Sequence, residues 1–170
     1  MEFNELIRAR YSCKKYDSRP VDRQALSVIL EAGRLAPTAR NAQVQRIYVL
    51  ESEEALAKFD EASPCRYGAP TVLVVAYYVN DAYVYPSGTM DSGAEDAAIV
   101  ATHLMLAAKN EGVESCWLNK IEPEKLAASL NLPDSEKVVL ALDLGYAAED
   151  AGPLPNHFKR KDLSETTFYL

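Results

Sequence analysis

The chain is poor in the residues from which metal sites and disulfide frameworks are built. Its two histidines, His103 and His157, are far apart and lack the spacing of a metal-binding pair. Its three cysteines, Cys13, Cys65 and Cys116, are odd in number and include no C-x-x-C pair. We therefore expect no metal site and no disulfide framework, and we predict reduced thiols in a cytoplasmic protein.

Long apolar runs and an excess of basic residues are also absent. The longest apolar stretch, residues 72–79, is too short to span a bilayer, and the acidic N-terminus lacks the apolar run of a signal peptide. The chain has 18 Lys and Arg residues and 25 Asp and Glu residues, which give it a formal charge of −7. We therefore predict neither membrane insertion nor nucleic-acid binding, which needs an excess of cations on one face.

The remaining composition is that of an ordinary globular protein. Apolar residues make up 48% of the 170 positions and charged residues 25%. This length is sufficient for one domain with a real core, and no repeat, linker or low-complexity run divides it. We predict a single domain over residues 1–170.

Hydrophobic periodicity predicts helices that alternate with strands over most of the chain. Helices are expected over 3–10, 22–36, 52–59, 91–110 and 123–130, and strands over 47–50, 70–79, 115–118, 138–144 and 166–170. The strand at 70–79 is almost continuously apolar, so we expect it at the centre of a sheet with both faces covered. Alternation alone favours an α/β fold, but the two opening helices and the tail strand fit poorly. A tail strand without a local partner is expected to pair with another chain.

Two short segments carry the strongest chemical signals. In an extended segment Arg10, Ser12 and Lys14 share one face, so two cations flank a hydroxyl, as a phosphate requires. At residues 36–43, a proline that ends a helix precedes Asn41, whose amide has both a donor and an acceptor for the edge of a heterocycle. Alone, a segment like the first is more often a solvated basic turn, and one like the second is more often an ordinary helix-to-strand loop.

Two further segments are compatible with the same ligand. At residues 112–120 a glycine ends the long apolar helix and a strand carries Trp117 to its tip, where ligands often bind in sheet proteins. Trp117 is equally suited to a place in the core. In the tail, Lys159, Arg160 and Lys161 are three consecutive cations, which either are solvated or return to the phosphate site.

Taken in order, the four segments resemble the nitroreductase family, whose members use FMN. The resemblance covers Arg-x-Ser-x-Lys, Ala-Pro-Thr-Ala-x-Asn-x-Gln, a long apolar helix that runs into Gly-x-x-Ser-Cys-Trp-Leu, and Arg-Lys-x-Leu near the end. It implies an α+β fold in which helices flank a mixed central sheet. It further implies an intertwined homodimer, with the C-terminal extension swapped onto the partner and FMN bound at the subunit interface.

The resemblance also implies roles for individual residues. Arg10 and Ser12 would hold the phosphate with the backbone of Tyr11, and Lys14 would reach the ribityl chain or the N1/O2 edge. From the other subunit, Pro37, Thr38 and Ala39 would lie along the ring, with Asn41 near its pyrimidine end. The implied cofactor-binding residues are Arg10, Tyr11, Ser12, Lys14, Pro37, Thr38, Ala39, Asn41, Gln43, Trp117, Leu118, Asn119, Arg160 and Lys161.

The implied activity is hydride transfer from NADH or NADPH through flavin N5 to a nitroaromatic, quinone or related acceptor. No catalytic side chain is required, because the cofactor carries the chemistry. Tyr83 and Tyr85, in a loop, are candidates to line the substrate face. Two departures from the family pattern are Lys14, where Arg is frequent, and Asn119, where Gly is frequent.

Three alternatives remain open. One is a flavin-binding sensor or storage protein without turnover. Another is a flavoenzyme of the same superfamily that does not use a nicotinamide. The third is an α/β binding module without a flavin, in which these motifs are coincidental.

Overall fold

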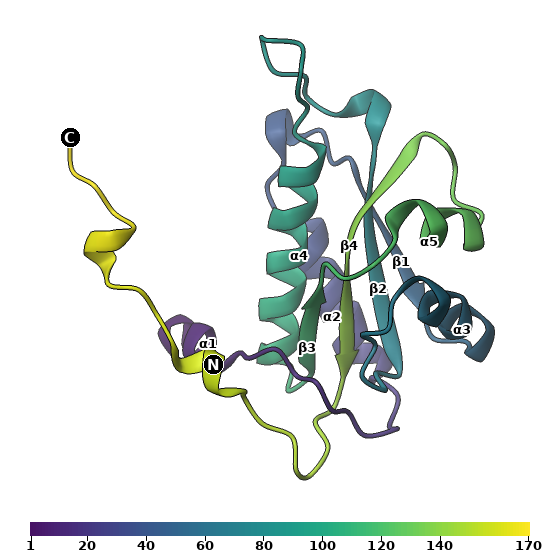
Figure 1. The fold of residues 1–170 in the computed structure, drawn as a ribbon, viewed down its shortest axis with the longest axis vertical. Coiled ribbons are helices and arrows are strands. Elements are labelled where there is room, and N and C mark those ends of the chain that lie inside the picture. The colour runs from purple at the N-terminus through teal and green to yellow at the C-terminus, as the bar shows by residue number, and fades with distance from the viewer.

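A four-stranded antiparallel sheet lies at the centre of the computed structural model, which describes residues 1–170 (Figure 1). The strands are β1 (Gln45–Leu50), β2 (Thr71–Tyr78), β3 (Glu114–Leu118) and β4 (Glu136–Gly145), in the order β1-β2-β4-β3. β2 and β4 therefore hold the inner positions. Every residue of β2 except the last is buried, as its apolar sequence predicts.

Helices cover both faces of this sheet. α2 (Arg23–Arg34) and α4 (Gly93–Asn110) lie on one face, and α3 (Glu53–Ala62) and α5 (Pro123–Ser129) lie on the other (Figure 1). α1 (Phe3–Ala9) packs against α4. The arrangement is α+β, as the family resemblance implies. No helix combines the length and the apolar character needed to cross a membrane.

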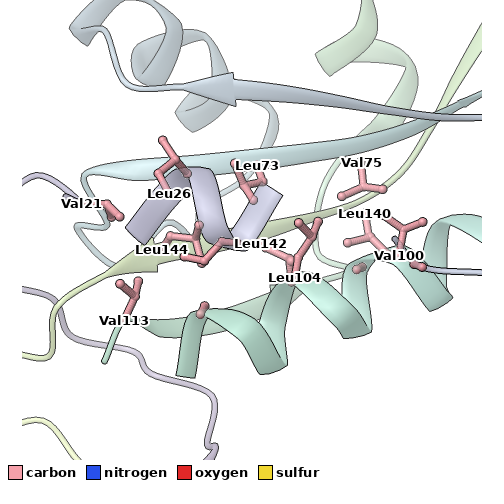
Figure 2. Close-up of a cluster of buried hydrophobic side chains, with 14 of the residues drawn as sticks. Val21, Leu26, Leu73, Val75, Val100, Leu104, Val113, Leu140, Leu142 and Leu144 are labelled. Carbon is pink, nitrogen blue, oxygen red and sulfur yellow. The ribbon is translucent and has the colours of Figure 1, made fainter. Parts of the chain in front are cut away.

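Alternation along β4 divides the core into two layers. Leu140, Leu142 and Leu144 point toward α2 and α4, where they meet Leu26 and Leu104 (Figure 2). Ala141, between Leu140 and Leu142 in the strand, belongs to a second cluster with Phe59 of α3 and Leu126 of α5. Both layers are free of solvent, so the sheet is a rigid platform whose edges and ends are left for binding.

A side-chain cap marks the start of α2, whereas α4 begins without one. The Asp22 carboxylate accepts hydrogen bonds from the N–H groups of Gln24 and Ala25 at 2.9 and 3.1 Å. α2 stops at Arg34, three residues before Pro37. Ser92 precedes α4 as predicted, but its hydroxyl donates to Asp96 at 2.8 Å instead of accepting from a helix N–H.

The four strands of this chain pair antiparallel throughout, so the α/β fold that element order alone favours is not formed and the chain has the α+β fold. The mixed sheet that the resemblance implies is not formed by these four strands alone. The order of helices and strands does not fix strand direction, because a short helix such as α3 begins and ends near the same end of the sheet. The parallel pairing found in the chain is an isolated bridge between Ser12 and Ser115.

The expected strand at residues 166–170 is not formed within this chain. The tail leaves the body of the molecule (Figure 1), and its last three residues are 75–122% exposed. A strand needs a hydrogen-bonded neighbour, and no strand of this chain lies beside the tail. Pairing of the tail with a second chain stays a prediction.

Candidate functional site

A cavity of about 500 Å³ lies at the β3 edge of the sheet, between the loop that follows α1 and the C-terminal tail. Cavities of this size accommodate small-molecule ligands. Its lining residues are Arg10, Ser12, Lys14, Cys65, Tyr67, Cys116, Trp117, Leu118, Asn119, Lys120, Leu154, Asn156, His157 and Arg160.

The loop after α1 is extended beside β3, which aligns its alternate residues. The N–H of Cys13 donates to the carbonyl of Ser115 at 2.9 Å, and this bond holds the loop parallel to the strand. Arg10, Ser12 and Lys14 line the cavity, whereas the residues between them are buried. The predicted shared face of these three side chains is therefore present.

The charge of the cavity opposes the charge of the whole protein. Four cations line it (Arg10, Lys14, Lys120 and Arg160), and no Asp or Glu does. None of the four belongs to any of the nine salt bridges of the chain. Unpaired cations around one cavity in a chain of net charge −7 make a local site for an anion.

The tail closes one side of this cavity. A 3₁₀ helix at Pro155–Phe158 places Asn156 and His157 in the lining, and Arg160 follows directly. The Arg160 guanidinium donates to the carbonyls of His157 and Lys159, the latter at 2.7 Å. The structure thus brings Arg160 together with Arg10, as predicted, but leaves Lys161 exposed and outside the lining.

The end of β3 forms another wall. Trp117, Leu118 and Asn119 all line the cavity, as the sequence predicts. The indole N–H of Trp117 donates to the side-chain oxygen of Asn119 at 2.8 Å, which orients both side chains. Trp117 also packs against the larger hydrophobic cluster, so it has a structural role as well as a place at the site.

Two lining residues, Cys65 and Tyr67, lie outside every segment singled out in the sequence and come from the loop after α3. Cys116 also lines the cavity and comes from β3, within a predicted segment. Burial, followed by the nearby Asp143, raises the pKa of Cys116 to about 11. A hydrogen bond with Cys65, followed by burial, raises the pKa of Tyr67 to about 12. The Cys116 thiol and the Tyr67 hydroxyl therefore keep their protons at neutral pH and add no negative charge to the cavity. Lys120 and His157, by contrast, adjoin predicted residues and could have been found.

The predicted ring-binding segment, residues 37–43, lies elsewhere. None of its residues lines the cavity at β3. Asp96, in the first turn of α4, accepts from the N–H of Ala39 at 2.7 Å, whereas Lys109, near the other end of α4, stands over Tyr11. Within one chain, the predicted phosphate-binding loop and the predicted ring-binding segment therefore lie at opposite ends of α4. Tyr11, also predicted to bind the cofactor, is buried and does not line the cavity.

A second cavity, of about 570 Å³, adjoins residues 37–43. Tyr83 lines it, together with Arg40, Ala42 and Asp81. Tyr85 does not line it, and its hydroxyl donates to Glu95 at 2.6 Å. Of the two tyrosines predicted to line a substrate pocket, the structure therefore places one beside the predicted ring-binding segment.

Comparison with known proteins agrees with this fold and site. The chain matches the Nitroreductase family over residues 7–66 and 62–146. A solved nitroreductase family protein from Clostridium difficile 630 is 32% identical, with a TM-score of 0.93 over 99% of this chain and 98% of that one. A relative from Archaeoglobus fulgidus, named "Putative NADH dehydrogenase/NAD(P)H nitroreductase", is 27% identical over 86% of each chain.

A more distant structure shares the fold. The protein from Exiguobacterium sibiricum, solved in complex with FMN, is 18% identical and has a TM-score of 0.85 over 100% of this chain and 98% of that one. The antiparallel α+β layers of this chain are the architecture that these solved structures share. The chain belongs to the nitroreductase family, which confirms the resemblance and the predicted enzyme class.

Proposed function

We propose that this protein is an FMN-dependent oxidoreductase, a single-domain cytoplasmic homodimer that transfers a hydride from NADH or NADPH to nitroaromatic, quinone or related electrophilic acceptors. The observation that carries the proposal is the cavity at β3, where Arg10, Lys14, Lys120 and Arg160 stand without acidic partners around the hydroxyl of Ser12. The FMN complex of the Exiguobacterium sibiricum protein supports the choice of cofactor, and the name of the Archaeoglobus fulgidus relative supports the choice of donor.

The residues of the cavity fit FMN chemically. Guanidinium and hydroxyl groups at Arg10, Ser12 and Arg160, which all line the cavity, would form charge-assisted hydrogen bonds to the phosphate. Lys14 supplies a further cation for the ribityl chain or the N1/O2 edge, where it would stabilise negative charge. The end of β3 at Asn119 offers backbone and amide groups to a ring edge. When bound, FMN supplies a ring that takes up and releases a hydride at N5.

A homodimer would complete the site. Residues 37–43 of one chain lie far from the cavity at β3 of the same chain, so they would have to reach the ring from a partner. Large apolar side chains are exposed on the elements that would meet that partner. Phe3 of α1 is 63% exposed, Ile99 of α4 is 37% exposed, and Phe158 and Leu163 of the tail are 71% and 79% exposed. Covering this surface would stabilise the dimer.

The overall reaction balances without a side-chain acid or base in the hydride step. A nitro group, one NAD(P)H and one proton give a nitroso group, NAD(P)⁺ and water. Donor and acceptor would use the same open face in turn, which is a ping-pong scheme. The protein residues bind the phosphate, orient the ring and hold the substrate against it.

Anaerobic reduction tests this function directly. The purified protein is expected to be yellow, to release FMN on denaturation, and to bleach when NADPH or NADH is added without oxygen. Adding a nitroaromatic or quinone should restore the colour. A yellow protein that no nicotinamide bleaches would instead indicate a sensor, a storage protein or a nicotinamide-independent flavoenzyme. A colourless protein that cannot be reconstituted with FMN would overturn the proposal.

Matched substitutions test the binding residues. Arg10→Gln and Lys14→Gln are expected to raise the dissociation constant for FMN by roughly tenfold each, because each removes a charge-assisted contact. Arg8→Gln and Lys15→Gln are the controls, since neither residue lines the cavity and Lys15 pairs with Asp150. Fluorescence titration of the apoprotein with FMN gives the four constants. Equal losses in the control and test variants would contradict the assignment.

A further inference from the structure

The second cavity joins two loops that are far apart in the sequence. Arg40 belongs to the loop between α2 and β1, and Tyr83 to the loop between β2 and α4. The guanidinium carbon of Arg40 lies 6.0 Å from the centre of the Tyr83 ring. Both side chains line the same space of about 570 Å³, so a cation and an aromatic face are presented together to a ligand.

The backbone holds Arg40 in an unusual conformation. Its φ is +54°, and Asn41 and Gln43 have φ values of +55° and +51°. Residues other than glycine rarely adopt this left-handed region, and each such residue costs roughly 1 kcal/mol or more. Three of them within four residues form a strained segment, and strain of this kind concentrates at ligand-binding sites.

Hydrogen bonds to side chains hold this strained segment in place. Asp96 is only 2% exposed, and its carboxylate accepts from the N–H of Ala39 at 2.7 Å and from the hydroxyl of Ser92 at 2.8 Å. The hydroxyl of Thr38 accepts from the N–H of Gln43 at 2.9 Å. Arg40 is therefore presented by a preorganised loop, which lowers the entropic cost of binding a ligand.

The charge of Arg40 is not neutralised by the protein. Its guanidinium takes part in none of the nine salt bridges of the chain. Asp81 lines the same cavity without pairing to it, and no other acidic side chain lines this space. A free guanidinium beside an aromatic ring is suited to a planar ligand that carries a carboxylate, because the carboxylate accepts two parallel hydrogen bonds.

We propose that Arg40 and Tyr83 are specificity-determining residues that select acceptors carrying a carboxylate on an aromatic or quinone ring. The inference rests on the proposed function, which places residues 37–43 of one chain against the cofactor ring of the other. Arg40 is in the middle of that segment, so it would meet the acceptor and not the phosphate of the cofactor. Asp81 opposes the anion and limits the affinity to a range that permits release of the product.

Two acceptors of similar shape, of which only one carries a carboxylate, test this selection. The ratio of kcat/KM for 4-nitrobenzoate to that for 4-nitrobenzyl alcohol is expected to fall about tenfold in Arg40→Gln, as expected for loss of one charge-assisted contact. Arg40→Lys should recover part of the ratio, because it keeps the charge without the bidentate geometry. Lys58→Gln is the control, since Lys58 pairs with Glu54 on α3 and lines neither cavity.

A binding measurement gives a readout that is independent of turnover. Calorimetric titration of the purified protein with benzoate should show roughly tenfold weaker binding in Arg40→Gln. Binding should be about two- to threefold tighter in Asp81→Asn, because a partly screened like charge is removed. Tyr83→Phe should bind as the unchanged protein does, whereas Tyr83→Leu should bind more weakly, because the ring and not the hydroxyl makes the contact.

The outcomes separate this inference from the proposed function. An unchanged acceptor ratio and unchanged benzoate affinity in Arg40→Gln would overturn the inference, even in a fully active enzyme. A change in the NADPH to NADH preference without any change in the acceptor ratio would also overturn it, because Arg40 would then recognise the donor. If no nicotinamide is oxidised at all, the proposed function fails, and the benzoate titrations alone decide the role of Arg40.

Discussion

Asp143 is an acidic residue whose pKa lies far from its ordinary range. It lies on β4, between Val72 of β2 and Cys116 of β3, and it has no exposed surface. Neither of its carboxyl oxygens has a hydrogen-bond partner. Burial raises its pKa to about 9 despite the opposing influence of Arg66, so it carries a proton at neutral pH. A neutral carboxylic acid thus lies behind the wall of the cavity at β3.

The raised pKa makes the stability of the protein depend on pH. In the unfolded chain Asp143 titrates near 3.8, so between that pH and about 9 the folded protein binds one more proton than the unfolded protein. Stability is then lost as the pH rises through this interval, by at most about 1.4 kcal/mol per unit from this group. Asp143→Asn has nearly the same shape and does not ionise, so it should lack this loss.

Urea denaturation of the two proteins checks this prediction. The free energy of unfolding of Asp143→Asn, relative to the unchanged protein, should be larger at about pH 8 than at about pH 5. Subtracting the free energy of unfolding of the unchanged protein cancels the contribution of all other groups, because these titrate in both proteins. A difference that stays constant between the two pH values would show that Asp143 is not held protonated.

At the scale of elements, α4 organises both candidate sites. Its first turn holds residues 37–43 through Asp96, and Lys109 near its last turn packs over Tyr11 beside the cavity at β3. The start of the helix fits tightly against β2, because a Cβ atom at Gly93 would lie 2.0 Å from the ring of Tyr77. The absence of a side chain at Gly93 therefore sets how closely α4 approaches the sheet.

Replacing this glycine should disturb the helix and the loop that it holds. Gly93→Ala is expected to cost roughly 1–3 kcal/mol of stability, because the buried Tyr77 ring must move. Gly152→Ala is the matched control, since a Cβ atom at that position meets nothing within 4 Å. Thermal unfolding should show a lower melting temperature in the first variant alone. Equal melting temperatures would mean that the Tyr77 ring relaxes at no cost.

At the scale of the whole molecule, the single chain leaves its apolar tail uncovered. Leu154, Phe158, Leu163 and Phe168 are all at least half exposed. A monomer with this tail would expose several large apolar side chains to water at considerable cost. The proposed homodimer resolves this by placing the tail on the partner.

Shortening the tail tests whether it covers the partner chain, and it leaves the cavity at β3 in place. A chain that ends at Lys161 keeps Arg160 and His157 but loses Leu163, Phe168 and Leu170. Its dimer dissociation constant is expected to rise by at least about tenfold, since burial of one such side chain is worth roughly 1.5–3 kcal/mol. Sedimentation equilibrium measures the change. An unaltered dimer, or a monomeric full-length protein, would contradict the proposed role of the tail.

Features that depend on neighbours in the sequence could be predicted from it. The cap at Asp22 and the buried strand at Thr71–Tyr78 follow from local side-chain chemistry and hydrophobic pattern. The shared face of Arg10, Ser12 and Lys14 follows from the period of an extended backbone. Each requires only a few consecutive residues, whose conformations are limited by their own backbone and side chains.

Features made by long-range packing could not be predicted in this way. Folding alone brings Cys65 and Tyr67 to the cavity at β3. It also buries the carboxyl group of Asp143 and places Arg40 beside Tyr83. The antiparallel direction of the strands was decided in the same way, because an alternating order of elements is compatible with either direction. These contacts join residues that the sequence separates by tens of positions, and only the packing of the complete sheet and its helices selects among the many pairings that the local patterns allow.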